Sequence, residues 1–223
     1  MVIWIALMCA QADGLGEAAT KAAVMTNYTF QVSTVREESG GGGRPMEFTG
    51  GADAGVLHVQ NDRIDAYRKG ETLVVKGEDG RWSVAEPPAK GEKPEKGQRG
   101  VMMLRTARPP HEELTGLETK LENVMKTEEE GKTVYSGSLT SDGAAQFGTP
   151  AGRRPGGPLA FSGNAKVWVD GQGVIVKYEL TIQAKGKLKD KEIDATTTRT
   201  VEIRDVGTTK LEIPEEVGAL LNP

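Results

Sequence analysis

Residues 165–214 decide the fold, and they read AKVWVDGQGVIVKYELTIQAKGKLKDKEIDATTTRTVEIRDVGTTKLEIP. Side chains of a β-strand point alternately to its two faces, so a strand that covers a core has an apolar residue at every second position. From 174 to 184 the even positions are apolar, whereas most odd positions carry Lys, Glu, Thr or Gln. This alternation predicts a long strand with one buried face. The glycines of 170–173 predict a tight hairpin to a strand at 165–169, because glycine tolerates positive φ angles.

The run that follows, residues 192–204, alternates in the same way. Its apolar residues fall on odd positions, and the threonines between them are β-branched, which favours an extended chain. Gly207 predicts a break before a further strand at 208–213. Pro214 and the two glutamates after it predict the start of a helix. A meander of antiparallel strands with one apolar face must cover something, and what it covers is the functional question.

Helices are expected in three other places. Residues 13–26 are rich in alanine and have apolar residues at helical spacing, and residues 142–147 predict a short helix. The clearest helix is predicted at 111–126, after two prolines. Its apolar stripe consists of Leu114, Leu117, Leu121, Val124 and Met125.

The rest of the chain predicts short strands and two long loops. Glycines and Asn-Asp or Asp-Gly pairs separate the strands, and Gly50-Gly51 is one of the predicted turns. The predicted strands are 28–33, 46–49, 56–60, 63–68, 72–76, 81–84 and 133–139. The loops are 86–100 and 148–163, which are rich in Pro, Gly and charge, and the first is interpreted as a surface loop within one domain.

Composition excludes several classes of protein. The 223 residues suffice for one sizeable domain, and the formal net charge of −4 argues against a binder of nucleic-acid phosphates, which would carry a basic excess. No segment of the mature chain reaches the ~20 apolar residues of a membrane-spanning helix. Because of the acidic net charge, we expect no nucleic-acid partner.

The N-terminus predicts export. Residues 2–9 (VIWIALMC) form an apolar run, and Ala10-Gln11-Ala12 matches a signal-peptidase site. The prediction is a signal peptide at 1–12 and one mature domain at 13–223, in the periplasm or cell envelope. Two alternatives stay open, a buried N-terminal strand and a lipoprotein that is anchored through Cys9. Cleavage after Ala12 would leave no cysteine.

The sequence has no catalytic constellation. His58 and His111 have no helix-spaced partner, so no metal site is predicted. A mature chain without cysteine has no Cys-His nucleophile, and no Gly-x-Ser-x-Gly elbow is present. We expect a protein that is not an enzyme and has no cofactor.

The order of motifs resembles the bacterial LolA-like and LppX-LprG-like superfamily of envelope proteins. The quoted motifs, in chain order, are Tyr28-Thr29-Phe30, Tyr67-Arg68-Lys69-Gly70, Asp79-Gly80-Arg81-Trp82, Val167-Trp168-Val169-Asp170-x-x-Gly173, Asp205-Val206-Gly207-Thr208-Thr209 and Leu211-Glu212-Ile213-Pro214-Glu215-Glu216. The resemblance implies an α+β fold, in which a strongly curved antiparallel β-sheet, a half-barrel, is closed by a few α-helices over an apolar cavity. It also implies that the chain transports the acyl chains of lipids or lipoproteins between membranes.

The functional hypothesis is therefore a monomeric, non-catalytic carrier or sensor of acyl chains, with membrane-bound donor or acceptor proteins as further partners. Reversible burial of acyl chain would drive binding, at ~0.8 kcal/mol per CH₂ group. The residues expected to line the cavity are Tyr28, Phe30, Val32, Phe48, Leu117, Val176, Tyr178, Leu180 and Ile182. The first alternative is an envelope scaffold or interaction protein with the same shell and a filled core. A hydrolase that uses carboxylates is a third, less favoured hypothesis.

Overall fold

The computed structural model describes residues 14–38, 41–43, 45–86, 101, 104–105, 107–149, 159–188 and 191–222. The predicted signal peptide at 1–12, with Cys9, lies outside these residues. So do most of the loop at 86–100 and much of the loop at 148–163.

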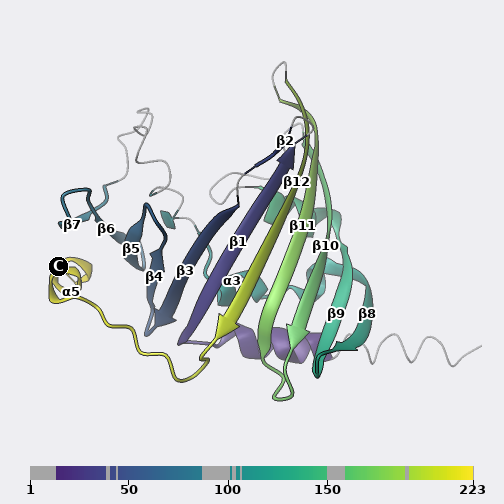
Figure 1. Cartoon of the computed structure of the whole chain (residues 1–223). Coiled ribbons are helices and arrows are strands. Elements are labelled where there is room, and N and C mark those ends of the chain that lie inside the picture. Colours follow the sequence, from purple (N-terminus) through teal and green to yellow (C-terminus); the bar gives the residue numbers. More distant parts are fainter. Residues whose placement is uncertain are drawn as a thin grey trace, which may run out of the picture.

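The described strands form one sheet of twelve, in which paired neighbours run antiparallel (Figure 1). The order across the sheet is β7-β6-β5-β4-β3-β1-β12-β11-β10-β9-β8, and β2 pairs with the end of β1. The bounds are β1 Tyr28–Glu38, β2 Gly41–Gly42, β3 Met46–Asp53, β4 Val56–Gln60, β5 Asp65–Lys69, β6 Thr72–Lys76, β7 Trp82–Val84, β8 Leu121–Glu129, β9 Lys132–Leu139, β10 Leu159–Val169, β11 Ile175–Leu188 and β12 Lys191–Arg204.

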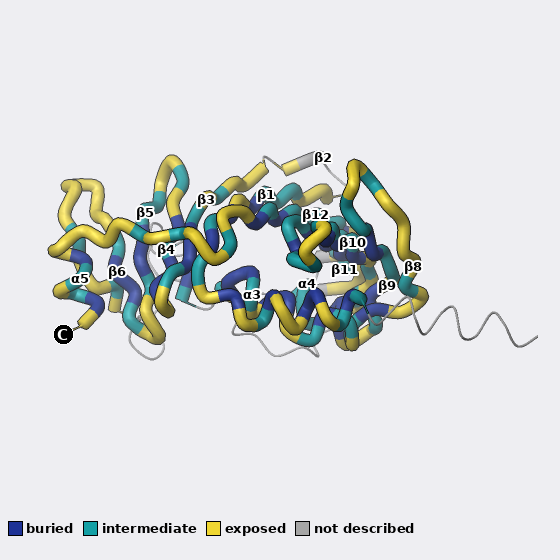
Figure 2. The backbone as a smooth tube through the Cα atoms, turned by 90° about the horizontal axis from the view of Figure 1, so that it is seen from below, coloured by how far each residue is buried: buried dark blue, intermediate teal, exposed yellow. Residues whose placement is uncertain are grey.

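β1 and β12 join the two halves of the chain in the middle of the sheet. Strands β3 to β7 continue from β1 as one meander, and β11 to β8 continue from β12 as another. Val32 pairs with Val201 and Phe30 with Ile203, and all four side chains belong to one core. The sheet curves around helices on one of its faces (Figure 2). The predicted fold class, an α+β half-barrel wrapped around a few helices, is confirmed.

β11 follows the predicted alternation over most of its length. Tyr178, Leu180 and Ile182 are buried in the core, as expected from their even positions. A β-bulge in the pairing with β10 shifts the register near the start of β11. As a result Ile175 is fully buried, whereas Val176 is only half-buried. A bulge inserts one extra residue and reverses the alternation beyond it, which the apolar pattern could not reveal.

Three helical segments lie on the concave face of the sheet. Residues 14–23 are helical, as predicted, and Leu15, Ala18 and Ala22 are buried in the same core as β1 and β11. α3 (Pro110–Leu114) and α4 (Ser141–Gly148) contribute further buried side chains to this core. Apolar faces of helix and sheet are thus removed from water together, which is the main source of stability in such a layer.

α5 (Glu215–Leu221) packs on the opposite face of the sheet. Pro214 precedes it, as predicted, and Val217 contacts a second core that includes Tyr67 of β5. The strand predicted at 208–213 is wrong, because this segment has no strand pairing and leads across the sheet to α5. The N–H group of Leu211 instead donates to the carboxylate of Asp53.

The helix predicted at 111–126 is wrong beyond its first turn. α3 is followed by Gly116, whose φ of +68° lies in the left-handed region, and then by the short 3-10 helix η1 (Glu118–Lys120). From Leu121 the chain is β8, which pairs with β9. Leu121 is buried, but Met125 is 63% exposed, so their helical spacing was coincidental. Pairing with β9 outweighed the helical pattern of this segment, because intrinsic helix propensity is readily overridden by tertiary contacts.

The predicted turn at Gly50-Gly51 is also wrong, since both glycines lie inside β3. A Cβ atom on Gly50 would lie 2.2 Å from the carbonyl oxygen of His58 and 2.6 Å from Cζ of Phe30. The glycine is therefore needed for a close approach of Phe30 to the curved sheet, and not for a turn.

Candidate functional site

α3 places three successive side chains in three different environments. Pro109 and Pro110 begin the helix, which fits the fixed φ of proline at a helix N-terminus. His111 is half-buried, Glu112 is exposed, and Glu113 is buried with 8% of its surface accessible. The three side chains thus lie against the sheet, at the rim and inside the core, respectively.

Glu113 is held between two strands in the centre of the sheet. The hydroxyl of Tyr178 on β11 donates to its Oε2, and Nη1 of Arg199 on β12 donates to its Oε1. Burial and the nearby Glu113 carboxylate raise the pKa of Tyr178 well above 10. Burial lowers the pKa of Arg199, but the Glu113 carboxylate and Tyr178 together outweigh it and the net shift is upward. The arrangement is a buried, hydrogen-bonded ion pair that fastens α3 to the sheet.

His111 is fixed by Tyr28 of β1. The Tyr28 hydroxyl lies 2.6 Å from Nδ1 of His111, and the backbone N–H of His111 donates to that hydroxyl at 3.5 Å. Burial raises the pKa of Tyr28 above its ordinary value, so the phenol is neutral. Because its oxygen already accepts from the backbone N–H of His111, we assign the hydroxyl hydrogen to the bond with Nδ1. Burial lowers the pKa of His111, so the imidazole is neutral near pH 7. The remaining ring nitrogen, Nε2, then carries the hydrogen.

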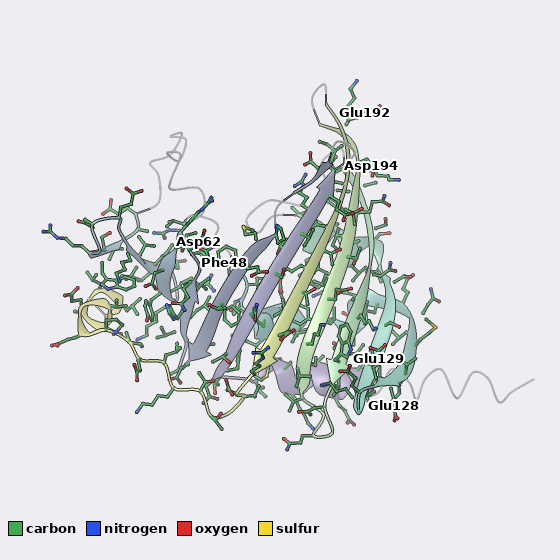
Figure 3. The ribbon with its side chains drawn as sticks, viewed as in Figure 1. Phe48, Asp62, Glu128, Glu129, Glu192 and Asp194 are labelled. Carbon is green, nitrogen blue, oxygen red and sulfur yellow. The ribbon has the colours of Figure 1, made fainter. Side chains whose placement is uncertain are left out.

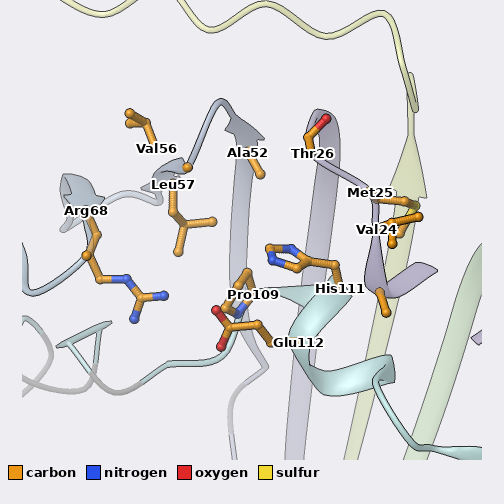
Figure 4. Close-up of a pocket in the computed structure, with 13 residues that line it drawn as sticks. Val24, Met25, Thr26, Ala52, Val56, Leu57, Arg68, Pro109, His111 and Glu112 are labelled. Atoms are coloured by element: carbon orange, nitrogen blue, oxygen red, sulfur yellow. The ribbon is translucent and has the colours of Figure 1, made fainter. Parts of the chain in front are cut away.

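A pocket of about 310 Å³ opens at one end of the concave face, beside α3 (Figure 4). Its walls come from the chain just after the first helix, from the β3–β4 hairpin, from β5 and from α3. Apolar side chains make up most of the wall, and Val24, Met25, Leu57 and Pro109 are among them. The polar side chains are Thr26, Arg68, His111 and Glu112.

Arg68 connects the pocket to the segment that precedes α3. Its Nη1 donates to the carbonyl oxygens of Leu104 at 3.0 Å, Arg105 at 3.0 Å and Ala107 at 2.7 Å. Burial lowers the pKa of Arg68, and the charge of Glu112 opposes that shift. The Arg68 and Glu112 side chains point toward one another across the pocket (Figure 4).

The nine residues predicted to line the cavity lie outside the pocket beside α3. Seven of them are buried in the filled core, namely Tyr28, Phe30, Val32, Leu117, Tyr178, Leu180 and Ile182. Phe48 packs against this core from its edge, and Val176 lies half-buried beside the β-bulge. Figure 3 shows Phe48 on β3, near the outer part of the meander. None of the nine lines the pocket beside α3.

The sequence pattern does not indicate the pocket residues. His111 is a potential metal ligand by residue type, and Leu57 and Arg68 belong to short predicted strands. A Pro-Pro-His-Glu-Glu segment that begins a helix is a usable signal, because it places polar side chains at a defined helix start. The described residues contain no group of His, Cys, Asp and Glu side chains that could hold a metal ion. Nor do they include a helix long and apolar enough to cross a membrane.

No protein-family model and no curated protein sequence matches the chain. Solved structures do match it. LprF from Mycobacterium bovis is 11% identical, with 93% of this chain and 97% of that chain covered and a TM-score of 0.49. A LolA superfamily protein from Nitrosomonas europaea is 9% identical, and the match covers 90% of this chain and 94% of that chain with a TM-score of 0.32. A DUF1329 family protein from Desulfovibrio piger is 10% identical, and the match covers 90% of this chain and 94% of that chain with a TM-score of 0.25.

Proposed function

We propose that this protein is an exported, non-catalytic carrier or sensor that binds the acyl chain of a lipid or lipoprotein in the bacterial cell envelope. The observation that supports this proposal best is the pocket beside α3. Its volume of about 310 Å³ is at the lower end of the range for small-molecule sites, and most of its wall is apolar. Each CH₂ group that moves from water into such a site contributes about 0.8 kcal/mol.

The rim of the pocket supports the same proposal. Val24 lines the pocket and is 73% exposed, so its apolar surface is accessible to a ligand chain. An acyl chain that enters beside Val24 would pass Met25 and Leu57 and reach the edge of the core. Donor and acceptor proteins in the membranes remain part of this proposal, because a carrier must be loaded and unloaded.

Binding of a fluorescent acyl probe tests the proposal. Leu57 points into the pocket (Figure 4), so Leu57→Trp should fill space that the ligand needs and weaken probe binding at least tenfold. Leu220→Trp is the matched control, because Leu220 is a half-buried leucine of α5 on the other face of the sheet. It should leave probe affinity within about twofold. Thermal unfolding of both variants would separate a blocked pocket from a damaged fold.

The scaffold alternative has one observation in its favour. The concave face beneath the central strands is filled by apolar side chains and by the Glu113 ion pair, as in an ordinary packed core. If the wild-type protein binds no acyl probe, and if protein purified from a bacterial envelope holds no lipid in native mass spectrometry, the carrier proposal is wrong and the scaffold is preferred.

Export is the second part of the proposal. Cleavage after Ala12 would leave Asp13 as the first residue of the mature protein, directly before the first helix. N-terminal sequencing of protein from the envelope fraction would test this directly. A retained Met1 or a diacylated Cys9 would each contradict the cleavage site.

A further inference from the structure

We propose that the pocket selects acyl chains that end in an uncharged group with both a hydrogen-bond acceptor and a donor, such as an amide or a hydroxyl, over free fatty acids. The inference rests on the proposed function and specifies the ligand of the same site. The pocket has four polar side chains, and the inference follows from three of them, Arg68, His111 and Glu112; the fourth is Thr26 at the exposed rim.

His111 supplies a donor that the protein does not use. Its Nδ1 lies 2.6 Å from the Tyr28 hydroxyl, and with that hydroxyl assigned as the donor the imidazole hydrogen is on Nε2. Among the described residues, no hydrogen-bond partner lies near Nε2, while the side chain lines the pocket. A neutral N–H group in such a place favours a carbonyl or hydroxyl oxygen as its acceptor.

Arg68 and Glu112 provide opposite charges on two sides of the same space. They point toward one another, yet within the described part of the chain they do not form an ion pair within 4.0 Å (Figure 4). The Nη1 of Arg68 is already shared by three backbone carbonyls. A ligand group between them can accept a hydrogen bond from the guanidinium and donate one to the carboxylate. An amide or a hydroxyl can do both, whereas an ester can only accept.

The charge balance disfavours a carboxylate ligand. Arg68 attracts it and Glu112 repels it, so the two Coulomb terms largely cancel, whereas the loss of its hydration remains. An amide or a hydroxyl loses much less hydration on entry. Glu112 is exposed, which puts the ligand's polar group at the rim and its chain inside. A pocket of about 310 Å³ equals roughly ten waters at the ~30 Å³ that each occupies in the liquid, so it suits one chain and not several.

Displacement of a bound acyl probe by ligands of equal chain length tests the inference. Dodecanamide, methyl dodecanoate and dodecanoic acid would be compared at pH 8, where the acid is ionised. The expected order of affinity is amide, then ester, then acid, with about a tenfold difference between the first and the last. Glu112→Gln should improve acid binding severalfold relative to amide binding, since it removes the repelling charge. Glu122→Gln, at an exposed position of β8 outside the pocket, should leave the order unchanged.

The outcomes separate this inference from the proposed function. If no ligand of the panel binds to the wild-type protein, the carrier proposal itself fails. If all three bind equally, if the acid binds best, or if Glu112→Gln leaves the order as it was, the carrier proposal stands and the selectivity inference is overturned.

Discussion

The carboxylate of Glu113 on α3 is paired with the guanidinium of Arg199 on β12, although the two residues are 86 positions apart in the sequence. A helix of five residues is far too short to be stable alone, so its position must come from its tertiary contacts. The ion pair is one of these contacts, together with the Tyr28–His111 contact and the burial of Leu114, and they position His111 and Glu112 in the pocket.

Removal of one partner of this ion pair should destabilise the protein strongly. In Glu113→Ala, Arg199 loses its counter-charge while 71% of its side chain stays buried, and we expect a loss of about 2–4 kcal/mol in the free energy of unfolding. Urea denaturation of the wild type and the variant would measure it. A loss below about 1 kcal/mol would mean that the pair behaves like a solvated surface pair.

A double variant provides the matched comparison. Replacing both charges with apolar side chains, as in Glu113→Leu with Arg199→Met, leaves no unpaired buried charge. Such replacements are often neutral or stabilising, so the double variant should be more stable than Glu113→Ala. Tyr178 would still lose its acceptor, which limits the recovery.

Tyr28→Phe should test how His111 is held. The substitution removes the hydroxyl that lies 2.6 Å from Nδ1 and leaves the core volume almost unchanged. We expect a loss of about 1–2 kcal/mol in stability, because a half-buried acceptor loses its donor. Tyr67→Phe is the control, since the Tyr67 hydroxyl makes one longer contact, 3.3 Å to the carbonyl oxygen of Glu212. A smaller effect for Tyr28→Phe than for Tyr67→Phe would contradict the assigned contact.

Stability should fall as the pH drops below the ordinary pKa of histidine. Burial lowers the pKa of His111 from its ordinary value of 6.5, so the unfolded chain takes up a proton more readily than the folded protein. The contribution of His111 to stability is thus fully present above about pH 6.5 and is lost as the pH falls through the folded-state pKa. His111→Gln does not titrate, so its free energy of unfolding should vary less between pH 7.5 and pH 4.5. Parallel curves for the two proteins would refute the prediction.

Much of the sheet could be predicted because its signal is local. The alternation in β11 and β12 and the glycine turns of the short hairpins are properties of neighbouring residues. The helix at 14–23 was visible for the same reason. The sequence did not reveal that Ile175 is buried in place of Val176, because the β-bulge that causes this depends on how β11 pairs with β10.

The candidate site could not be predicted, because it is assembled from distant segments. Arg68 and His111 are 43 positions apart, and nothing near either of them in the sequence indicates the other. The predicted wall residues were chosen by polarity and periodicity, which identify the buried face of a strand but not whether that face is covered by side chains or left open. Whether the face is covered depends on how the first helix and α3 pack against the sheet.

Leu121 and Met125 distinguish the observed strand from the helix that the sequence predicted. On a helix the two would share a face, whereas in β8 Leu121 is buried and Met125 is 63% exposed. Leu121→Asp should therefore cost about 2–4 kcal/mol in stability, and Met125→Asp no more than about 0.5 kcal/mol. Similar losses for both variants would indicate that this segment is helical in solution.

Leu180 tests whether the filled core ever opens to a ligand. It is 3% exposed in the core beneath β11, so Leu180→Trp should overpack this region and destabilise the protein by about 1–3 kcal/mol. If the acyl chain stays in the pocket beside α3, this variant should still bind the acyl probe, because Leu180 is not part of the pocket wall. If the chain instead pushes α3 aside and enters between sheet and helices, probe binding should be lost together with stability. Parallel measurements of thermal unfolding and probe binding on Leu180→Trp and Leu57→Trp decide the matter. Loss of binding in Leu57→Trp alone places the ligand in the pocket, and loss in both means that the carrier expands around its ligand.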